Sequence, residues 1–170
     1  EFDQNFSPLK AESEREGTLK RIVFLVKEAE KERLGTAREF LGAASVNLPE
    51  IIFTNSAQPF NFFLYYQKTG VRKGLIVAIE NEARVFRALV DQEAIMRNAW
   101  SGLFEISDPK GTLAAFEDIT YRNIDIRRLQ LSETNDLGLY YAIFKPKKYL
   151  LITTSLESMK TTINRIFDSL

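Results

Sequence analysis

The apolar positions of the chain follow two patterns, one typical of strands and one typical of helices. Short runs or alternations of apolar residues predict strands at 19–26, 51–54, 60–67, 75–80, 116–121, 124–131, 139–144 and 149–153. Apolar residues at helical spacing predict three helices: a short one opened by Thr36, a long one over about 82–103 and a C-terminal one from about Ser155.

Turn residues separate most of these predicted strands. Tight turns are expected around Lys68–Gly70, Arg122–Asn123 and Pro146, whereas the charged segment Lys27–Arg33 is expected to be a connector. Strands that follow one another through tight turns pair antiparallel. The sequence therefore predicts an α+β fold with a mainly antiparallel sheet and about three helices packed on it.

Each predicted helix is preceded by residues that can cap it. Thr36 with Glu39 fits a capping box, and so does Thr154 with Glu157. Asn81 can cap the long helix.

Composition shifts along the chain suggest how it is organised. Residues 1–17 are polar and are expected to form a linker or arm, and residues 18–170 a single domain. The breaker Asp108–Gly111 divides that domain into halves at 18–107 and 112–170.

The two halves share an order of elements. Leu64-Tyr65-Tyr66 in the first half and Leu139-Tyr140-Tyr141 in the second each precede a basic turn, a second strand and a helix. This order suggests an internal duplication of a hairpin–helix unit. The alternative is that hairpins followed by helices are common and that the matching tripeptides reflect strand propensity alone.

One predicted strand is unusually aromatic. Alternation puts Phe60, Phe62 and Leu64 on one face, and Phe63 and Tyr65 on the other. Two apolar faces predict a central strand that is covered on both sides; the alternative is an exposed aromatic patch for a partner.

Composition narrows the chemistry available to the protein. The chain has no Cys and no His, which removes thiolate chemistry, the usual metal ligands and the usual general base. Its 23 Lys and Arg balance 23 Asp and Glu, which argues against non-specific nucleic-acid binding. The 13 Phe and 6 Tyr provide ample material for a core.

No apolar run approaches the about 20 residues needed to span a bilayer. We expect the chain to be an excised or processed part of a longer protein, whose anchor or signal would lie upstream.

Carboxylates are the remaining acid–base candidates. Glu117 and Asp118 are adjacent in a strand and should point to opposite faces, and Glu80 and Glu82 flank a helix start. The segment Ser132–Asp136 is acidic but lacks the EF-hand pattern, so a polar turn is favoured over a calcium site.

The sequence contains neither a phosphate-binding loop nor a dinucleotide-binding motif. Lys110-Gly111-Thr112 lacks the upstream glycine of a phosphate loop, and the eight glycines form no dinucleotide fingerprint. We therefore predict no catalytic residue, no cofactor and no metal site.

The strongest surface candidate is basic. Two predicted hairpin tips carry cationic residues that would form a ledge for an anionic cell-wall polymer, lipid headgroups or an acidic partner. These residues are Arg72, Lys73, Lys145, Lys147 and Lys148. The competing interpretation is that the turns are solvated and that lysines guard sheet edges against aggregation.

The second half also carries a family pattern: a strand, tight turn and strand at 116–127, then Leu139–Ile143, then a strand ending in Thr-Thr-Ser and a helix at 149–159. Over residues 112–168 the chain resembles bacterial extracytoplasmic domains of unknown function that are tethered by one N-terminal transmembrane helix. The resemblance implies a location outside the cytoplasmic membrane in the cell envelope and a non-enzymatic character. It supplies no catalytic residues.

The resemblance and the missing residue types together predict a non-enzymatic binding or assembly domain of a membrane-anchored bacterial protein. Its partner would be a protein or another component of the cell envelope, not nucleic acid. Two alternatives remain open: a carboxylate-only hydrolase of cell-wall carbohydrate, and a pilus or secretion-type scaffold subunit.

Overall fold

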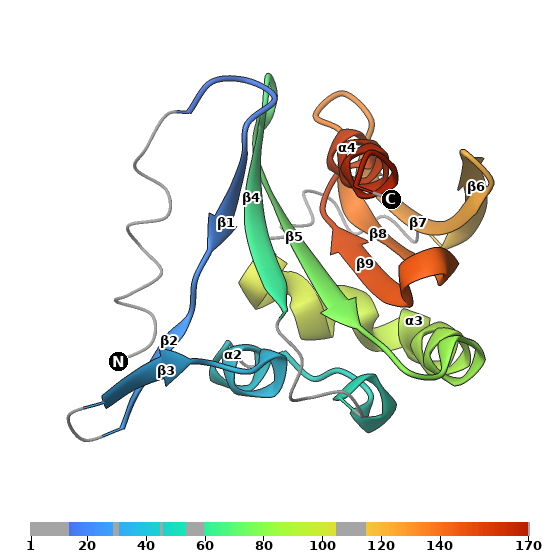
Figure 1. The fold of residues 1–170 in the computed structure, drawn as a ribbon. Coiled ribbons are helices and arrows are strands. Elements are labelled where there is room, and N and C mark those ends of the chain that lie inside the picture. The colour runs from blue at the N-terminus through green and yellow to red at the C-terminus, as the bar shows by residue number, and fades with distance from the viewer. Residues whose placement is uncertain (1–13, 29–30, 45, 54–59, 105–114, 170) are drawn as a thin grey trace.

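The computed structural model describes residues 14–28, 31–44, 46–53, 60–104 and 115–169 (Figure 1). Its centre is a sheet of seven strands in the order β1-β4-β5-β9-β8-β7-β6, and all neighbouring strands pair antiparallel. The strands are β1 Leu19–Ile22, β4 Asn61–Gln67, β5 Gly70–Ala78, β6 Glu117–Tyr121, β7 Ile124–Ser132, β8 Leu137–Phe144 and β9 Tyr149–Thr153.

Helices cover both faces of this sheet. Figure 1 shows α4 (Leu156–Phe167) in front of the sheet and α3 (Glu82–Phe104) behind it. The short helix α2 (Ala37–Ala43) packs into the same core as α3. The predicted α+β class, the mainly antiparallel sheet and the three helices are confirmed.

Alternation along the strands divides the core into two. Even residues of β4 and odd residues of β5 and β8 pack with α2 and α3, whereas Tyr140 and Ala142 of β8 pack with Met159 and Ile163 of α4. In the aromatic strand, Phe63 and Tyr65 are also buried. The prediction that β4 is a central strand covered on both faces is therefore confirmed.

The first predicted strand is wrong beyond Ile22. The chain leaves the main sheet and forms a separate hairpin of β2 (Leu25–Glu28) and β3 (Lys31–Leu34), so the predicted connector at 27–33 is largely strand. The break lies at Val23 and Phe24, between β1 and β2, and the Phe24 ring lies 5.6 Å from that of Phe40 between centroids. Cross-strand pairs of apolar or oppositely charged residues support the hairpin, although its residues favour strands weakly. The pairs are Leu25 with Leu34 and Lys27 with Glu32.

The predicted strand at 51–54 is also wrong. Residues Glu50–Phe53 form a 3₁₀ turn, η2, in which the Ile52 amide donates to the Pro49 carbonyl at 2.9 Å. Ile52 and Phe53 are buried. A short apolar run satisfies either structure, and the preceding proline favours the turn.

Two of the predicted helix caps are confirmed and the third shifts by one residue. Thr36 and Glu39 form the capping box of α2, and Asn81 accepts the Arg84 amide at the start of α3. For α4 the N-cap is Ser155, because the side chain of Thr154 accepts the Lys73 amide instead.

The two hairpin–helix units share one sheet, since β5 pairs with β9. Their helices lie on opposite faces: α3 belongs to one core and α4 to the other. The units therefore share their order of elements but not the side on which their helix packs. The boundary expected at Asp108–Gly111 lies outside the described residues.

No helix in the described ranges combines the length and apolar character that crossing a membrane requires.

Candidate functional site

The five predicted basic residues do not form one ledge. Lys73 lies at the Thr154 end of β9, where its amide donates to the Thr154 side chain. Lys148 lies at the other end of β5, where its carbonyl accepts the Ile79 amide. Because β5 and β9 run antiparallel, the two hairpin tips are at opposite ends of the sheet.

Arg72 is not a surface residue; only 7% of it is exposed. Its guanidinium donates to the carbonyls of Val71, Thr69, Asn135 and Asp136. Burial lowers the pKa of this arginine, opposed by the nearby Asp136 carboxylate. Arg72 thus ties the β4–β5 tip to the β7–β8 turn, which is a structural role.

The β8–β9 tip remains open to solvent. Lys145, Lys147 and Lys148 are exposed in the short turn η3 (Lys145–Lys147) and its cap. Their use as a binding surface stays a prediction, as does that of the half-buried Lys73. Of the five residues, Lys145 lines a cavity.

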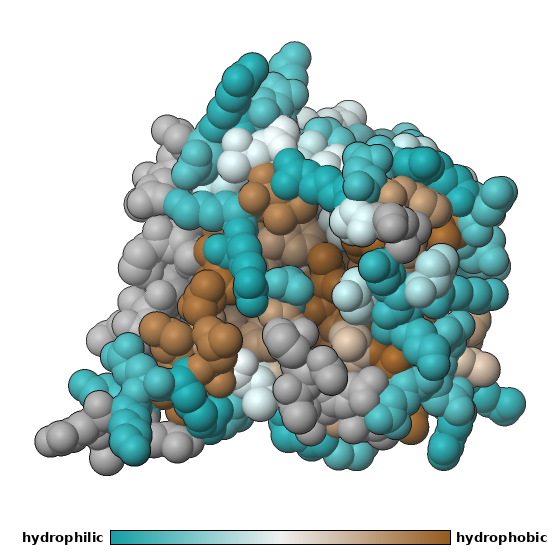
Figure 2. Space-filling model, viewed as in Figure 1, coloured by the Kyte–Doolittle hydropathy of each residue, from teal (hydrophilic) through white to brown (hydrophobic). Residues whose placement is uncertain are grey.

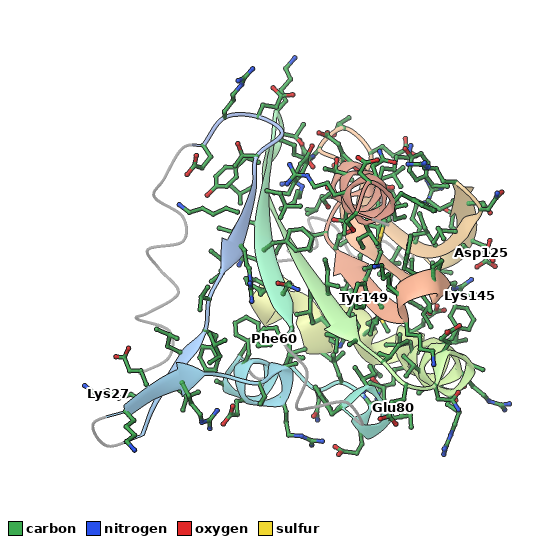
Figure 3. The ribbon with its side chains drawn as sticks, in the orientation of Figure 1. Lys27, Phe60, Glu80, Asp125, Lys145 and Tyr149 are labelled. Carbon is green, nitrogen blue, oxygen red and sulfur yellow. The ribbon has the colours of Figure 1, made fainter. Side chains whose placement is uncertain are left out.

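That cavity, the end pocket, has a volume of about 690 Å³. It lies where the start of α3, the β6–β7 turn, the end of β8 with η3, and the end of α4 meet. Its lining consists of Glu82, Ala83, Phe86, Arg122, Asn123, Ile124, Asp125, Ile143, Lys145, Pro146 and Phe167. Figure 3 shows Asp125 and Lys145 at this end of the sheet, far from Lys27 on the β2–β3 hairpin.

Aromatic rings provide much of the apolar lining. Phe86 of α3 packs against Tyr141 at 6.2 Å between ring centroids, and Phe167 of α4 packs edge-on against Phe144 at 5.0 Å. Tyr141 and Phe144 are fully buried. The two lining rings are therefore anchored on the core and present their remaining surface to the pocket.

The β6–β7 turn holds Arg122 in place. Arg122 and Asn123 both have positive φ, 49° and 62°, as the two central residues of a tight hairpin turn require. The Arg122 guanidinium lies 4.3 Å from the Phe167 ring centroid and donates to the Asn164 side chain at 3.0 Å. Stacking and hydrogen bonding together orient this cation at the pocket wall.

The two acidic residues of the lining, Glu82 and Asp125, lie on the α3 side of the sheet. Ile124 and Ile126 pack toward α4, so Asp125 between them points toward the α3 face, where it accepts the Thr120 hydroxyl at 3.2 Å. Glu82 occupies the first turn of α3. Within the described ranges, Glu82, Asp125 and Lys145 form no salt bridge.

A partly buried ion pair lies next to the pocket, beyond Phe86. Arg127 donates two hydrogen bonds to Glu93 of α3, at 2.7 and 2.6 Å, and the Tyr141 hydroxyl donates to the same carboxylate at 2.6 Å. Sequence reasoning missed this group. No local pattern could have revealed it, because Arg127 and Tyr141 lie 34 and 48 residues from Glu93 in the chain.

The predicted carboxylate candidates are placed as follows. Glu117 and Asp118 do point to opposite faces, where they pair with Arg128 and Arg127 respectively. Asp136, in the loop considered for calcium, accepts the amides of Leu156 and Glu157 at 2.9 Å each and so caps α4. Among the described residues, no three acidic side chains lie close enough together to bind one metal ion.

Sequence reasoning also missed the grouping of Glu82 with Asp125. The sequence pattern groups Glu82 only with Glu80, and no local pattern marks Asp125. The two residues are far apart in the chain, and both line the end pocket.

A second surface is apolar. Figure 2 shows hydrophobic side chains gathered at the left of the molecule, over the β1–β2 segment. Val23 between β1 and β2, Leu25 of β2 and Leu34 of β3 are 54%, 53% and 59% exposed. Leu25 and Leu34 are a cross-strand pair of the β2–β3 hairpin.

No protein-family model, curated protein or solved structure matches this chain.

Proposed function

We propose that this domain is a non-catalytic binding module whose ligand occupies the end pocket. The pocket itself carries the proposal. Its volume of about 690 Å³ lies in the range of roughly 300–1,000 Å³ typical of small-molecule sites. An apolar lining with a few charged groups around it is also typical of such sites.

The proposal includes a location outside the cytoplasmic membrane, in a bacterial protein held by an N-terminal anchor. Its support is the resemblance of residues 112–168 described above. The full-length reading frame tests it: about 20 consecutive apolar residues upstream would support the anchor.

A pocket-filling variant tests the binding function. Ala83 lines the pocket, whereas Ala94 is exposed on α3 outside its lining. We expect some aromatic or aliphatic fragments to raise the Tm of the wild type and of the control Ala94→Trp, but not that of Ala83→Trp. At ten times its Kd a fragment adds about 1.4 kcal/mol, which corresponds to about 3 to 6 °C. If every fragment that stabilises the wild type stabilises the two variants equally, binding does not take place in the pocket.

A hydrolase remains the second candidate, favoured by Glu82 and Asp125 lining one pocket. It predicts release of reducing ends from purified peptidoglycan. Release that is lost in both Glu82→Gln and Asp125→Asn would replace the non-catalytic proposal.

The exposed apolar residues of the β2–β3 hairpin favour a third candidate, an assembly subunit. Self-association that is lost in Leu25→Ser, with the pocket's binding unchanged, would support it.

A further inference from the structure

We infer that the end pocket takes a short peptide with a free ammonium group, a free carboxylate and a bulky apolar side chain. This inference rests on the proposed binding function and names its ligand class. It follows from how charges of both signs are distributed around an apolar lining.

The two signs of charge come from different sides of the pocket. Asp125 and Glu82 belong to the α3 side of the sheet, whereas Arg122 is held over Phe167 at the end of α4. Lys145 follows β8 directly, and the pairing of β8 with β7 brings it next to the turn that carries Arg122 and precedes Asp125. Arg122 and Asp125 thus place charges of opposite sign on opposite faces of the sheet at this end of the molecule.

This arrangement selects against ligands of a single charge. A purely anionic ligand would bring its charge toward Glu82 and Asp125, and a purely cationic ligand would bring its charge toward Arg122 and Lys145. Like charges brought together in this way disfavour binding. A neutral ligand would desolvate charged groups without pairing them.

The placement of Arg122 and Asp125 on opposite faces of the sheet favours a peptide over a free amino acid. A free amino acid carries both charges on neighbouring groups, whereas a short peptide separates them by its backbone. Phe86, Ile143 and Phe167 offer the apolar surface that a bulky side chain would bury. The volume of about 690 Å³ suits a ligand of several residues better than a single ion.

The test is a ¹H–¹⁵N NMR titration of the whole chain with the tripeptide Ala-Phe-Ala. We expect saturable shifts at Phe86, Ile143 and Phe167. Acetylating the N-terminus or amidating the C-terminus should each weaken binding by about tenfold, and free phenylalanine should bind more weakly than the tripeptide.

Charge-removing variants assign each end of the peptide. Arg122→Gln should weaken binding of the free tripeptide but should have little further effect on binding of its C-terminal amide. Asp125→Asn should weaken binding of the free tripeptide but should have little further effect on binding of the N-acetylated form. Arg87→Gln, an exposed change on α3 outside the pocket lining, should affect neither. Such a double-mutant cycle isolates each pairing from general loss of stability.

The outcomes separate this inference from the proposal beneath it. Fragments that bind the pocket, together with blocked and free peptides that bind equally or not at all, would overturn the peptide class and leave the binding function standing. Failure of both fragments and peptides would overturn both.

Discussion

Phe63 of β4 lies across Gly74 of β5, and this contact constrains how the two central strands pack. The two residues are direct partners in the antiparallel register. A Cβ atom on Gly74 would come 2.0 Å from Cζ of Phe63, and Phe63 is only 1% exposed. The buried ring occupies the space that any other residue at position 74 would need.

Gly74→Ala should therefore destabilise the protein. Displacing a buried ring costs about 1 to 3 kcal/mol, which exceeds the backbone-entropy gain of about 0.5 to 1 kcal/mol from replacing a strand glycine. Urea unfolding measures the difference. The cost should shrink when Gly74→Ala is made in a Phe63→Ala background, because the two residues share the space.

Gly42→Ala is the matched control, because nothing lies within 4 Å of the position of its added Cβ. Gly42 lies within α2, so alanine there should stabilise the protein by up to about 1 kcal/mol. If Gly74→Ala were as stable as Gly42→Ala, the ring would not be filling the space over Gly74.

Alternation along β4 was sufficient to predict which side chains share a face and that both faces are covered. It could not reveal that Phe63 requires a glycine beside it, because that depends on the register between two strands. The same holds for Arg72: a cation in a hairpin tip is usually solvated, and its burial follows from the carbonyls that the distant β7–β8 turn brings to it.

At the scale of elements, the capping box of α2 is reinforced from the β2–β3 hairpin. The Thr36 amide donates to the Glu39 carboxylate at 2.8 Å. Arg33 of β3 donates to the same carboxylate at 3.0 and 2.6 Å. The hydrogen bonds from Arg33, followed by that from the Thr36 amide, lower the pKa of Glu39 to about 2.

This depressed pKa predicts a pH dependence with a definite sign. The ionised Glu39 stabilises the native state above its unfolded pKa of about 4.3. As pH falls from there toward about 2, the carboxylate is protonated in the native state as well and this contribution is lost. Carboxyl ¹³C NMR should show Glu39 titrating far below the usual range. Arg33→Gln should move its midpoint upward, and a midpoint near 4.3 in the wild type would contradict the assignment.

Sequence patterns predicted the elements that depend on adjacent residues. They failed where a contact with a segment distant in the chain determines the structure. The Thr36–Glu39 box and the Asn81 cap were predictable because a cap and its helix are adjacent in the chain. Ser155 caps α4 instead of Thr154 because Thr154 is engaged by Lys73 across the sheet, which no local pattern encodes. The β2–β3 hairpin was missed because its charged residues gain stability only when paired.

At the scale of the whole molecule, the end pocket could not have been predicted. Its lining comes from four separate segments: the start of α3, the β6–β7 turn, the end of β8 with η3, and the end of α4. The sequence predicted the β6–β7 turn and the tip that carries Lys145. It could not predict that α3 and α4 lie on opposite faces and converge at one end, because the side on which each helix packs depends on the order of the strands.

The contact between Glu93 and Arg127 couples α3 to the C-terminal half of the sheet. The side chains of Arg127 and Glu93 are only 16% and 15% exposed, and Arg127 also donates to Asp118 at 3.0 Å. These partners raise the pKa of Arg127, chiefly through the hydrogen bonds to Glu93. Burial, followed by the hydrogen bond to Glu93, raises the pKa of Tyr141. Arg127 therefore stays charged and Tyr141 keeps its phenol proton across ordinary pH.

Glu93→Gln should lower the free energy of unfolding by about 2 to 3 kcal/mol, because it leaves a partly buried guanidinium without its main counter-charge. Arg128→Gln is the control: it breaks the more exposed pair with Glu117 on the opposite face, which should cost no more than about 1 kcal/mol. Hydrogen exchange should show α3 losing protection in Glu93→Gln while α4, packed on the other face, keeps it. Equal losses in both helices, or equal costs for the two variants, would mean that this ion pair does not anchor α3 to the sheet.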